Sequence, residues 1–318
     1  IFDEHPFFCQ RYLIGFEINS IYYDLKNKYP MRSKTITFNN KNKEELKGKI
    51  ELPVDQHAHS FAIFAHCFTC SKNLKAVKNI SKALTREGFG VLRFDFTGLG
   101  QSDGEFENTN FSHNVSDLID AAEFMKENYR SPSLLIGHSL GGAAVIQAAS
   151  MLDEVKAIAT IGSPYEPKHV QKLLKDDLES IQKNGVAKVD LGGREFTIKK
   201  QFLDDLENQT NANIVKNLKK PFLILHSPQD ETVNIDNAEK LYRDAFHPKS
   251  FISLDGADHL LMKNEDDAIY VGEATAAWAK RYLTIQDIDQ IPRSHEKVVG
   301  VLDANDNFTT DLKLGNHY

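Results

Sequence analysis

The sequence is poor in cysteine and contains no long apolar run. Its 318 residues include only three cysteines, too few for the disulfide framework of a small secreted domain. An odd number of cysteines points to a reducing compartment, so we expect a cytoplasmic protein. No apolar run approaches the roughly 18 residues of a membrane-spanning helix. The histidines show no convincing zinc-binding spacing, and we expect neither a metal nor another cofactor.

Excess positive charge is also missing. The chain has 38 Lys and Arg against 45 Asp and Glu, which gives a net charge of −7. Nucleic-acid binding usually needs a basic domain or stripe, and the sequence has neither, so this class of partner is not expected. A chain of this length, 41% apolar, can bury a core without help from disulfides or metals.

The first 30 residues differ from the rest of the chain. They begin with Ile1 and acidic residues and lack the basic start and apolar middle of a signal peptide. A strand-like pattern follows Met31 directly. We hypothesise that translation starts at Met31 and that 1–30 is a non-native or disordered extension; an ordinary N-terminal extension is the alternative.

The other end of the sequence changes character twice. Residues 285–296 are polar and contain Pro292, which is typical of a linker. Residues 297–318 carry two strand-like patterns, 298–302 and 308–314, around a turn-like stretch. About 20 residues cannot form a domain, so 297–318 is interpreted as the truncated start of one.

Residues 31–284 alternate between short apolar runs and helical periodicity. Residues 61–65 form a continuous apolar run, typical of a strand buried on both faces, and the next apolar residues recur at helical spacing. Strands are predicted at 35–38, 49–52, 61–65, 91–94, 134–136, 157–161, 222–225 and 251–254. Helices are predicted at 74–84, 115–122, 141–151, 238–246 and 268–283. Repeated βα units predict an α/β fold whose mostly parallel sheet has helices on both faces.

One segment, about 164–220, interrupts this alternation. It contains charged helical patterns at about 169–182 and 201–218, with a hairpin signal at 191–194 between them. Because open α/β sheets bind ligands at the carboxyl ends of their strands, an insertion of this kind predicts a small helical and hairpin lid.

Gly137-His138-Ser139-Leu140-Gly141 is a G-x-S-x-G motif between a predicted strand and a predicted helix. This is the context in which a sharp turn projects a nucleophilic serine, with glycines where the turn must close. We therefore predict Ser139 as the nucleophile. The N–H of Leu140, at the start of the helix, is predicted to be one oxyanion-hole donor.

A serine hydroxyl needs a base, and His259 follows the predicted strand 251–254 on the side of the sheet where Ser139 must lie. His66 and the adjacent Cys67 follow another strand and His138 lies in the motif itself, so all three are expected to line the site. His226 and His247 are less well placed.

The base in turn needs a carboxylate, and Asp230 lies just beyond the strand 222–225. The chain order of nucleophile, acid and histidine then matches that of α/β-hydrolases. The rival carboxylates are Glu231, Asp255 and Asp258; the last two share the loop of His259 and would struggle to reach behind its ring. The second oxyanion donor is placed by position at the N–H of Phe68, and the run 95–102 is interpreted as structural support.

With these residues in place, region 31–284 resembles an α/β-hydrolase of the serine-hydrolase type. More narrowly, AHCFTCSK (65–72), RFDFTGLG (93–100), QFLDDL (201–206) and SLDGADHLL (253–261) resemble the hydrolase half of fusions with an OsmC-like domain. The resemblance implies that 297–318 opens the OsmC-like part, which would be the partner in the full-length chain. Such hydrolases commonly have glycine where this sequence has Cys67.

Cys67 and Cys70 form a C-x-x-C pair. A redox pair, half of a metal site and two small side chains lining a loop are all open interpretations. We hypothesise that oxidation of the pair would distort the oxyanion loop.

These patterns predict a serine hydrolase that cleaves an acyl bond of a small molecule through an acyl-enzyme, with a carboxylester as the favoured substrate. Thioesters and peptides are compatible as well. The alternatives are a catalytically silent hydrolase-like scaffold and a thiol-redox module, either of them serving the OsmC-like domain.

Overall fold

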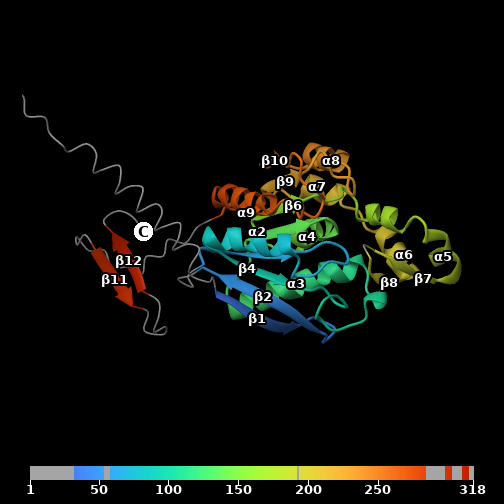
Figure 1. The fold of residues 1–318 in the computed structure, drawn as a ribbon, viewed down its shortest axis with the longest axis horizontal. Helices are drawn as coiled ribbons and strands as arrows, with labels where there is room; N and C mark the ends of the chain where they lie inside the picture. Colours follow the sequence, from blue (N-terminus) through green and yellow to red (C-terminus); the bar gives the residue numbers. More distant parts are fainter. Residues whose placement is uncertain (1–31, 54–57, 192, 284–297, 303–309, 315–318) are drawn as a thin grey trace, which may run out of the picture.

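The structure is a computed structural model that describes residues 32–53, 58–191, 193–283, 298–302 and 310–314. At its centre is an eight-stranded sheet with the order β1-β2-β4-β3-β5-β6-β9-β10 (Figure 1). The strands are β1 (Arg32–Asn39), β2 (Glu45–Leu52), β3 (Ser60–Ala65), β4 (Phe89–Phe94), β5 (Leu134–His138), β6 (Ala157–Ile161), β9 (Phe222–His226) and β10 (Lys249–Ser253). From β4 to β10 all neighbours are parallel, while β2 runs antiparallel to both β1 and β4. The predicted α/β architecture is confirmed.

Helices cover both faces of the sheet because its central strands are apolar on both sides. In β5, Leu134 and Ile136 pack in one buried cluster and Leu135 packs in the other, as the period of two in a strand requires. The first cluster also holds apolar residues of α2 (Lys75–Arg86) and α9 (Glu265–Lys280). The second holds those of α3 (Phe111–Asn128), α4 (Leu140–Met151) and α8 (Asp236–Asp244).

The predicted insertion lies between the neighbouring parallel strands β6 and β9. It consists of the 3₁₀ helix η2 (Pro167–Leu174), α5 (Leu178–Asn184), β7 (Val186–Asp190), β8 (Glu195–Lys199), α6 (Lys200–Asn208) and α7 (Ala212–Asn217). β7 and β8 pair as the predicted hairpin. We call this segment the lid.

Both helices predicted in the lid are divided in two. The first becomes η2 and α5. Where they divide, the N–H of Asp177 donates to the carbonyl of Leu174, three residues earlier rather than the four of an α-helix. The second becomes α6 and α7, because Asn211 donates its N–H to Glu166 (2.8 Å) and its side-chain amide to the carbonyl of Ala143 (3.2 Å). Tertiary hydrogen bonds override the helical periodicity there.

The lid packs on loops at the carboxyl ends of the strands. The ring of Phe202 in α6 stacks on Phe68, which follows β3, with centroids 5.2 Å apart. Phe196 of β8 meets Phe106 of the short helix η1 (Phe106–Asn108), in the connection after β4, at 5.0 Å. In Figure 1, β7, β8, α5 and α6 gather beyond one end of the sheet.

A separate hairpin is formed by β11 (Val298–Leu302) and β12 (Thr310–Leu314), which pair antiparallel with Val298 opposite Leu314. The two strand-like patterns near the end of the chain are thus confirmed, while their assignment to an OsmC-like domain stays a prediction. The predictions for 1–30 and for the linker 285–296 fall on residues outside those described. Every helix within the described ranges is too short or too polar to cross a bilayer.

Candidate active site

Ser139 lies at a sharp turn between β5 and α4, with φ 55° and ψ −126°. Such a backbone conformation is unfavourable for a residue with a side chain and is held only where the surroundings dictate it. The N–H of Ser139 is fixed by the carbonyl of Ile161 at 2.9 Å. The two flanking glycines are required sterically, since a Cβ on Gly137 would lie 2.3 Å from the carbonyl oxygen of Gly141. A Cβ on Gly141 would lie 2.4 Å from the carbonyl oxygen of His66.

We predict that Gly141→Ala destabilises this turn. The collision is with backbone of the loop after β3, which cannot swing aside as a flexible side chain would, so a loss of about 1–3 kcal/mol in the free energy of unfolding is expected. Urea titration measures it. Gly256→Ala is the control, because its Cβ has no neighbour within 4 Å and meets only the cost of a positive φ, 81°. Equal losses in the two variants would contradict the steric account.

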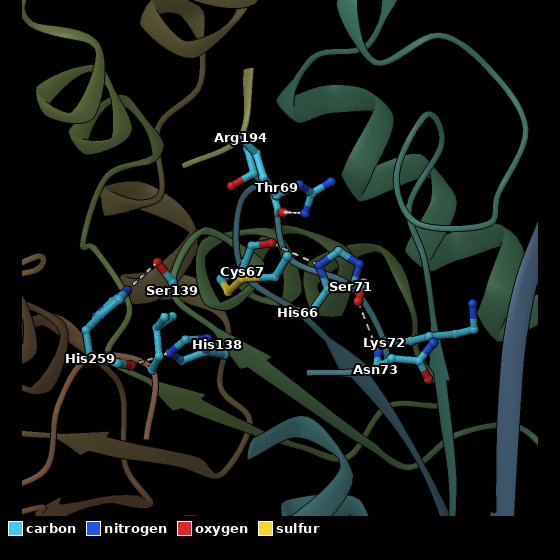
Figure 2. Close-up of a disulfide and its surroundings, with 12 residues drawn as sticks. His66, Cys67, Thr69, Ser71, Lys72, Asn73, His138, Ser139, Arg194 and His259 are labelled. Atoms are coloured by element: carbon cyan, nitrogen blue, oxygen red, sulfur yellow. Dashed lines mark hydrogen bonds between the residues drawn. A yellow bond between two sulfur atoms is a disulfide. The ribbon is translucent and has the colours of Figure 1, made fainter. Parts of the chain in front are cut away.

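The structure brings Ser139, His259 and Asp230 together. The distance from Nε2 of His259 to Oγ of Ser139 is 3.0 Å, and from Nδ1 of His259 to Oδ2 of Asp230 it is 2.7 Å. Asp230 follows β9, His259 follows β10 and Ser139 follows β5, so the three reach one edge of the sheet from separate strands. Figure 2 shows the ring of His259 directed at the serine hydroxyl.

The carboxylate of Asp230 is held in its charged form. Burial alone would raise its pKa, but the hydrogen bond and charge of His259 oppose this, and the pKa is lowered overall. The N–H groups of Val233 and Thr232 contribute by donating to Oδ1, both at 2.8 Å. One oxygen is therefore fixed by backbone, and the other is available to His259.

The rival carboxylates have other partners. Asp258 accepts backbone N–H bonds from Leu260, Met262 and Lys263, and so shapes the loop that carries His259. Asp255 accepts the hydroxyl of Ser253 at 2.6 Å. Glu231 is exposed. Among these carboxylates it is Asp230 that lies against His259.

Two further histidines lie next to the proposed catalytic residues: His138 beside His259, and His226 beside Asp230. Nε2 of His138 donates to the backbone carbonyl of His259 at 2.7 Å, as Figure 2 shows, and the two rings are 5.0 Å apart. His226, considered less well placed in the sequence, lies with Nε2 3.6 Å from Oδ2 of Asp230 and 2.7 Å from the carbonyl of Val233. Burial lowers the pKa of His226, so it is a neutral neighbour of the carboxylate.

His66 is expected from the sequence to line the site, but the structure buries it beneath the surface. Its ring is buried edge-on against Phe96, and its Nδ1 donates to the carbonyl of Cys67 at 2.9 Å. Nε2 of His66 has no hydrogen-bond partner in the described part of the chain. The desolvation of the ring lowers its pKa.

We predict that His138 makes the stability of the protein depend on pH. Burial, followed by the charge of His259, lowers the pKa of His138 from 6.5 to about 3. Between these two values the unfolded imidazole binds a proton and the folded one does not, so stability is lost as the pH falls. In His138→Gln the slope of unfolding free energy against pH should decrease by about 1.4 kcal/mol per pH unit in this window.

Urea unfolding at pH 4.5, 5.5 and 7 measures this slope. His113→Gln on α3 is the control. An unchanged slope in His138→Gln would contradict the buried, neutral state of His138.

The two predicted oxyanion donors lie in different elements: Leu140 in α4 and Phe68 in the loop after β3. Leu140 is the first residue of α4, and a helix has no internal acceptor for its first N–H groups. Phe68 lies in a turn in which the N–H of Cys70 donates to the carbonyl of Cys67 at 3.1 Å. The close approach of the His66 carbonyl to Gly141 brings this loop against the Ser139 turn.

Cys67 and Cys70 are joined by a disulfide (Figure 2). The two side chains of this loop are therefore a linked pair, which agrees with the interpretation as a redox pair and leaves neither thiol free as a metal ligand. The other end of the loop is tied down as well, because the fully buried Lys72 pairs with the fully buried Asp95. Asp95 also accepts the N–H of Lys72 at 2.7 Å and that of Gln101 at 2.9 Å, so 95–102 supports the loop as interpreted.

The described residues contain no cluster of three or more His, Cys, Asp or Glu that could hold a metal ion.

Several known proteins resemble this chain. Residues 63–184 match the family model described as serine aminopeptidase, S33. The esterase domain of a Rhodothermus marinus protein is 53% identical with a TM-score of 0.66, covering 79% of this chain and 99% of that domain. YfhR of Salmonella typhimurium is 24% identical, over 76% of this chain and 81% of its own. Human ABHD12B is 31% identical over 58% of this chain and 49% of its own.

Proposed function

Because this chain belongs to the α/β-hydrolase family, we propose that it is a serine hydrolase that cleaves carboxylesters through an acyl-enzyme on Ser139. One observation carries the proposal: the unbroken line of hydrogen bonds from Ser139 through His259 to Asp230. A hydroxyl is a weak nucleophile, and a histidine at 3.0 Å backed by a carboxylate is the arrangement that activates it.

In the proposed reaction, Oγ of Ser139 attacks the acyl carbonyl and His259 takes the serine proton at Nε2. Asp230 accepts the hydrogen bond from Nδ1, which fixes the tautomer and stabilises the imidazolium. The oxyanion of the tetrahedral intermediate is bound by the N–H groups of Leu140 and Phe68. His259 then protonates the leaving alcohol, and water activated by the same histidine releases the acid.

A carboxylester is the substrate class that the relatives favour. The matching Rhodothermus marinus structure is that of an esterase domain, which aligns with this chain over almost its whole length. Human ABHD10, named a palmitoyl-protein thioesterase, is 32% identical but only over 27% of this chain. A cavity of about 540 Å³ between η2 and α8 is lined in part by Tyr165, His169 and Lys172; none of the proposed catalytic residues lines it, so it carries no argument about the substrate.

Matched substrates test the proposal. Purified protein should hydrolyse p-nitrophenyl butyrate with a larger kcat/KM than the corresponding butyryl thioester or an aminoacyl p-nitroanilide. The variant Tyr242→Ala changes an exposed residue of α8 and should hydrolyse the three substrates as the wild type does. Folded protein that hydrolyses only the anilide, or none of the three, would overturn the proposed ester specificity.

A further inference from the structure

We propose that the Cys67–Cys70 disulfide is a thiol–disulfide exchange site that controls the oxyanion loop. The inference rests on the proposed function, since it assigns a role to the loop beside Ser139. Reduction of the disulfide by a dithiol is expected to release the turn that presents the N–H of Phe68, and so to slow ester hydrolysis. This is the reverse of the effect hypothesised from the sequence, because the loop with the disulfide formed is the one that lies against the Ser139 turn.

The turn from Cys67 to Cys70 is unfavourable for its own sequence. The bond from the N–H of Cys70 to the carbonyl of Cys67 closes it, and its third residue, Thr69, has φ 62°. Phe68 is not among the residues with positive φ, so this is the pattern of a type II turn. Such a turn calls for glycine or asparagine in its third position, and a β-branched threonine is strained there.

The disulfide spans this strained turn from its first residue to its last. It thereby restricts the conformations into which Thr69 could relax. The flanking residues are fixed independently, because the His66 carbonyl abuts Gly141 and Lys72 is anchored on Asp95. Loss of the cross-link would therefore act mainly on Phe68 and Thr69, and Phe68 is the proposed oxyanion donor.

The same turn contacts the lid at two points. The guanidinium of Arg194, at the β7–β8 hairpin, donates to the carbonyl of Thr69 at 3.0 Å, as Figure 2 shows. The ring of Phe68 stacks on Phe202 of α6. Relaxation of the turn is thus expected to free Arg194 as well, which provides a readout that does not depend on catalysis.

The different exposures of Cys67 and Cys70 determine which sulfur the dithiol attacks first. Cys67 is only 4% exposed, whereas Cys70 is half-buried. A thiolate of the dithiol would attack Sγ of Cys70, and the S–S electron pair would leave on Sγ of Cys67, which takes up a proton. The second thiolate of the reagent then attacks the mixed disulfide and releases the Cys70 thiolate. Two electrons and two protons pass to the cysteines, and the reagent leaves as its cyclic disulfide.

Dithiothreitol provides the test, with alkylation and intact-mass measurement to count the freed thiols. Reduction of the wild type should lower kcat for p-nitrophenyl butyrate about 10²- to 10³-fold, the range typical for the loss of one oxyanion donor. Trypsin should cleave after Arg194 severalfold faster in the reduced form. Cys9→Ser, which removes the third cysteine, should respond to dithiothreitol as the wild type does.

Two variants separate the turn from the sulfur chemistry. The double variant Cys67→Ser/Cys70→Ser should have the low kcat with or without dithiothreitol. Adding Thr69→Gly should restore much of it, because glycine adopts the positive φ without a cross-link.

The inference is overturned if reduced wild type, with two newly freed thiols, keeps both its kcat and its rate of cleavage at Arg194. If oxidised, folded protein hydrolyses no ester, the proposed function fails, and the rate of cleavage at Arg194 then decides whether the disulfide controls the loop.

Discussion

Ser139→Ala is expected to lower kcat for ester hydrolysis on the order of 10⁶-fold. The variant keeps the fold of the turn, because alanine differs from serine only by the hydroxyl. It removes the atom that lies 3.0 Å from Nε2 of His259 and would become acylated. KM should change little, since the proposed oxyanion donors are untouched.

Steady-state assays with p-nitrophenyl butyrate measure this loss. Ser150→Ala is a matched control, because Ser150 is an exposed serine near the far end of α4. Thermal unfolding should show both variants as stable as the wild type to within a few degrees. A decrease in kcat of less than about 100-fold for Ser139→Ala would mean that another group performs the attack, and the proposed mechanism would be wrong.

Asp230→Asn is expected to lower kcat about 10⁴-fold. The backbone bonds from Thr232 and Val233 to one oxygen can remain, so the shape of the loop should be kept. If the amide takes the place of the oxygen that now accepts the proton on Nδ1 of His259, it presents a donor there. The imidazole is then driven to the tautomer whose Nε2 carries the hydrogen, and it cannot take the proton of Ser139.

Measuring kcat of Asp230→Asn as a function of pH distinguishes the role of Asp230 in fixing the tautomer of His259 from a purely structural role. Asp255→Asn is the control, because Asp255 is on the loop of His259 but bonds to Ser253. A loss of less than tenfold in Asp230→Asn, or an equal loss in the control, would contradict the assignment of Asp230.

Much of this architecture is predictable from the sequence because its signals are local. A run such as 61–65, apolar at every position, can be satisfied only by a strand covered on both faces, and the structure buries it in that way. The G-x-S-x-G motif is local in part: Gly137 is required by contacts within the turn itself, whereas Gly141 is required by the carbonyl of His66 in the loop after β3. The candidate triad then follows from the positions of Asp230 and His259 after strands whose carboxyl ends meet.

The sequence did not reveal features that depend on contacts far along the chain. The division between α6 and α7 depends on Glu166 and Ala143, about 45 and 68 residues away from Asn211. The burial of Lys72 is equally hidden, because a lysine is expected at the surface unless its partner, here Asp95, is known. The position of His226 beside Asp230 could have been inferred from its place at the end of β9, four residues earlier.

The central claim is that Ser139 is activated by His259, and covalent labelling with a fluorophosphonate probe tests it most directly. The account predicts that the wild type is labelled at one site, which peptide mass mapping places at Ser139. It also predicts that Ser139→Ala is not labelled and that His259→Ala reacts far more slowly. No labelling of a folded wild type, or labelling that persists in Ser139→Ala, would contradict the account.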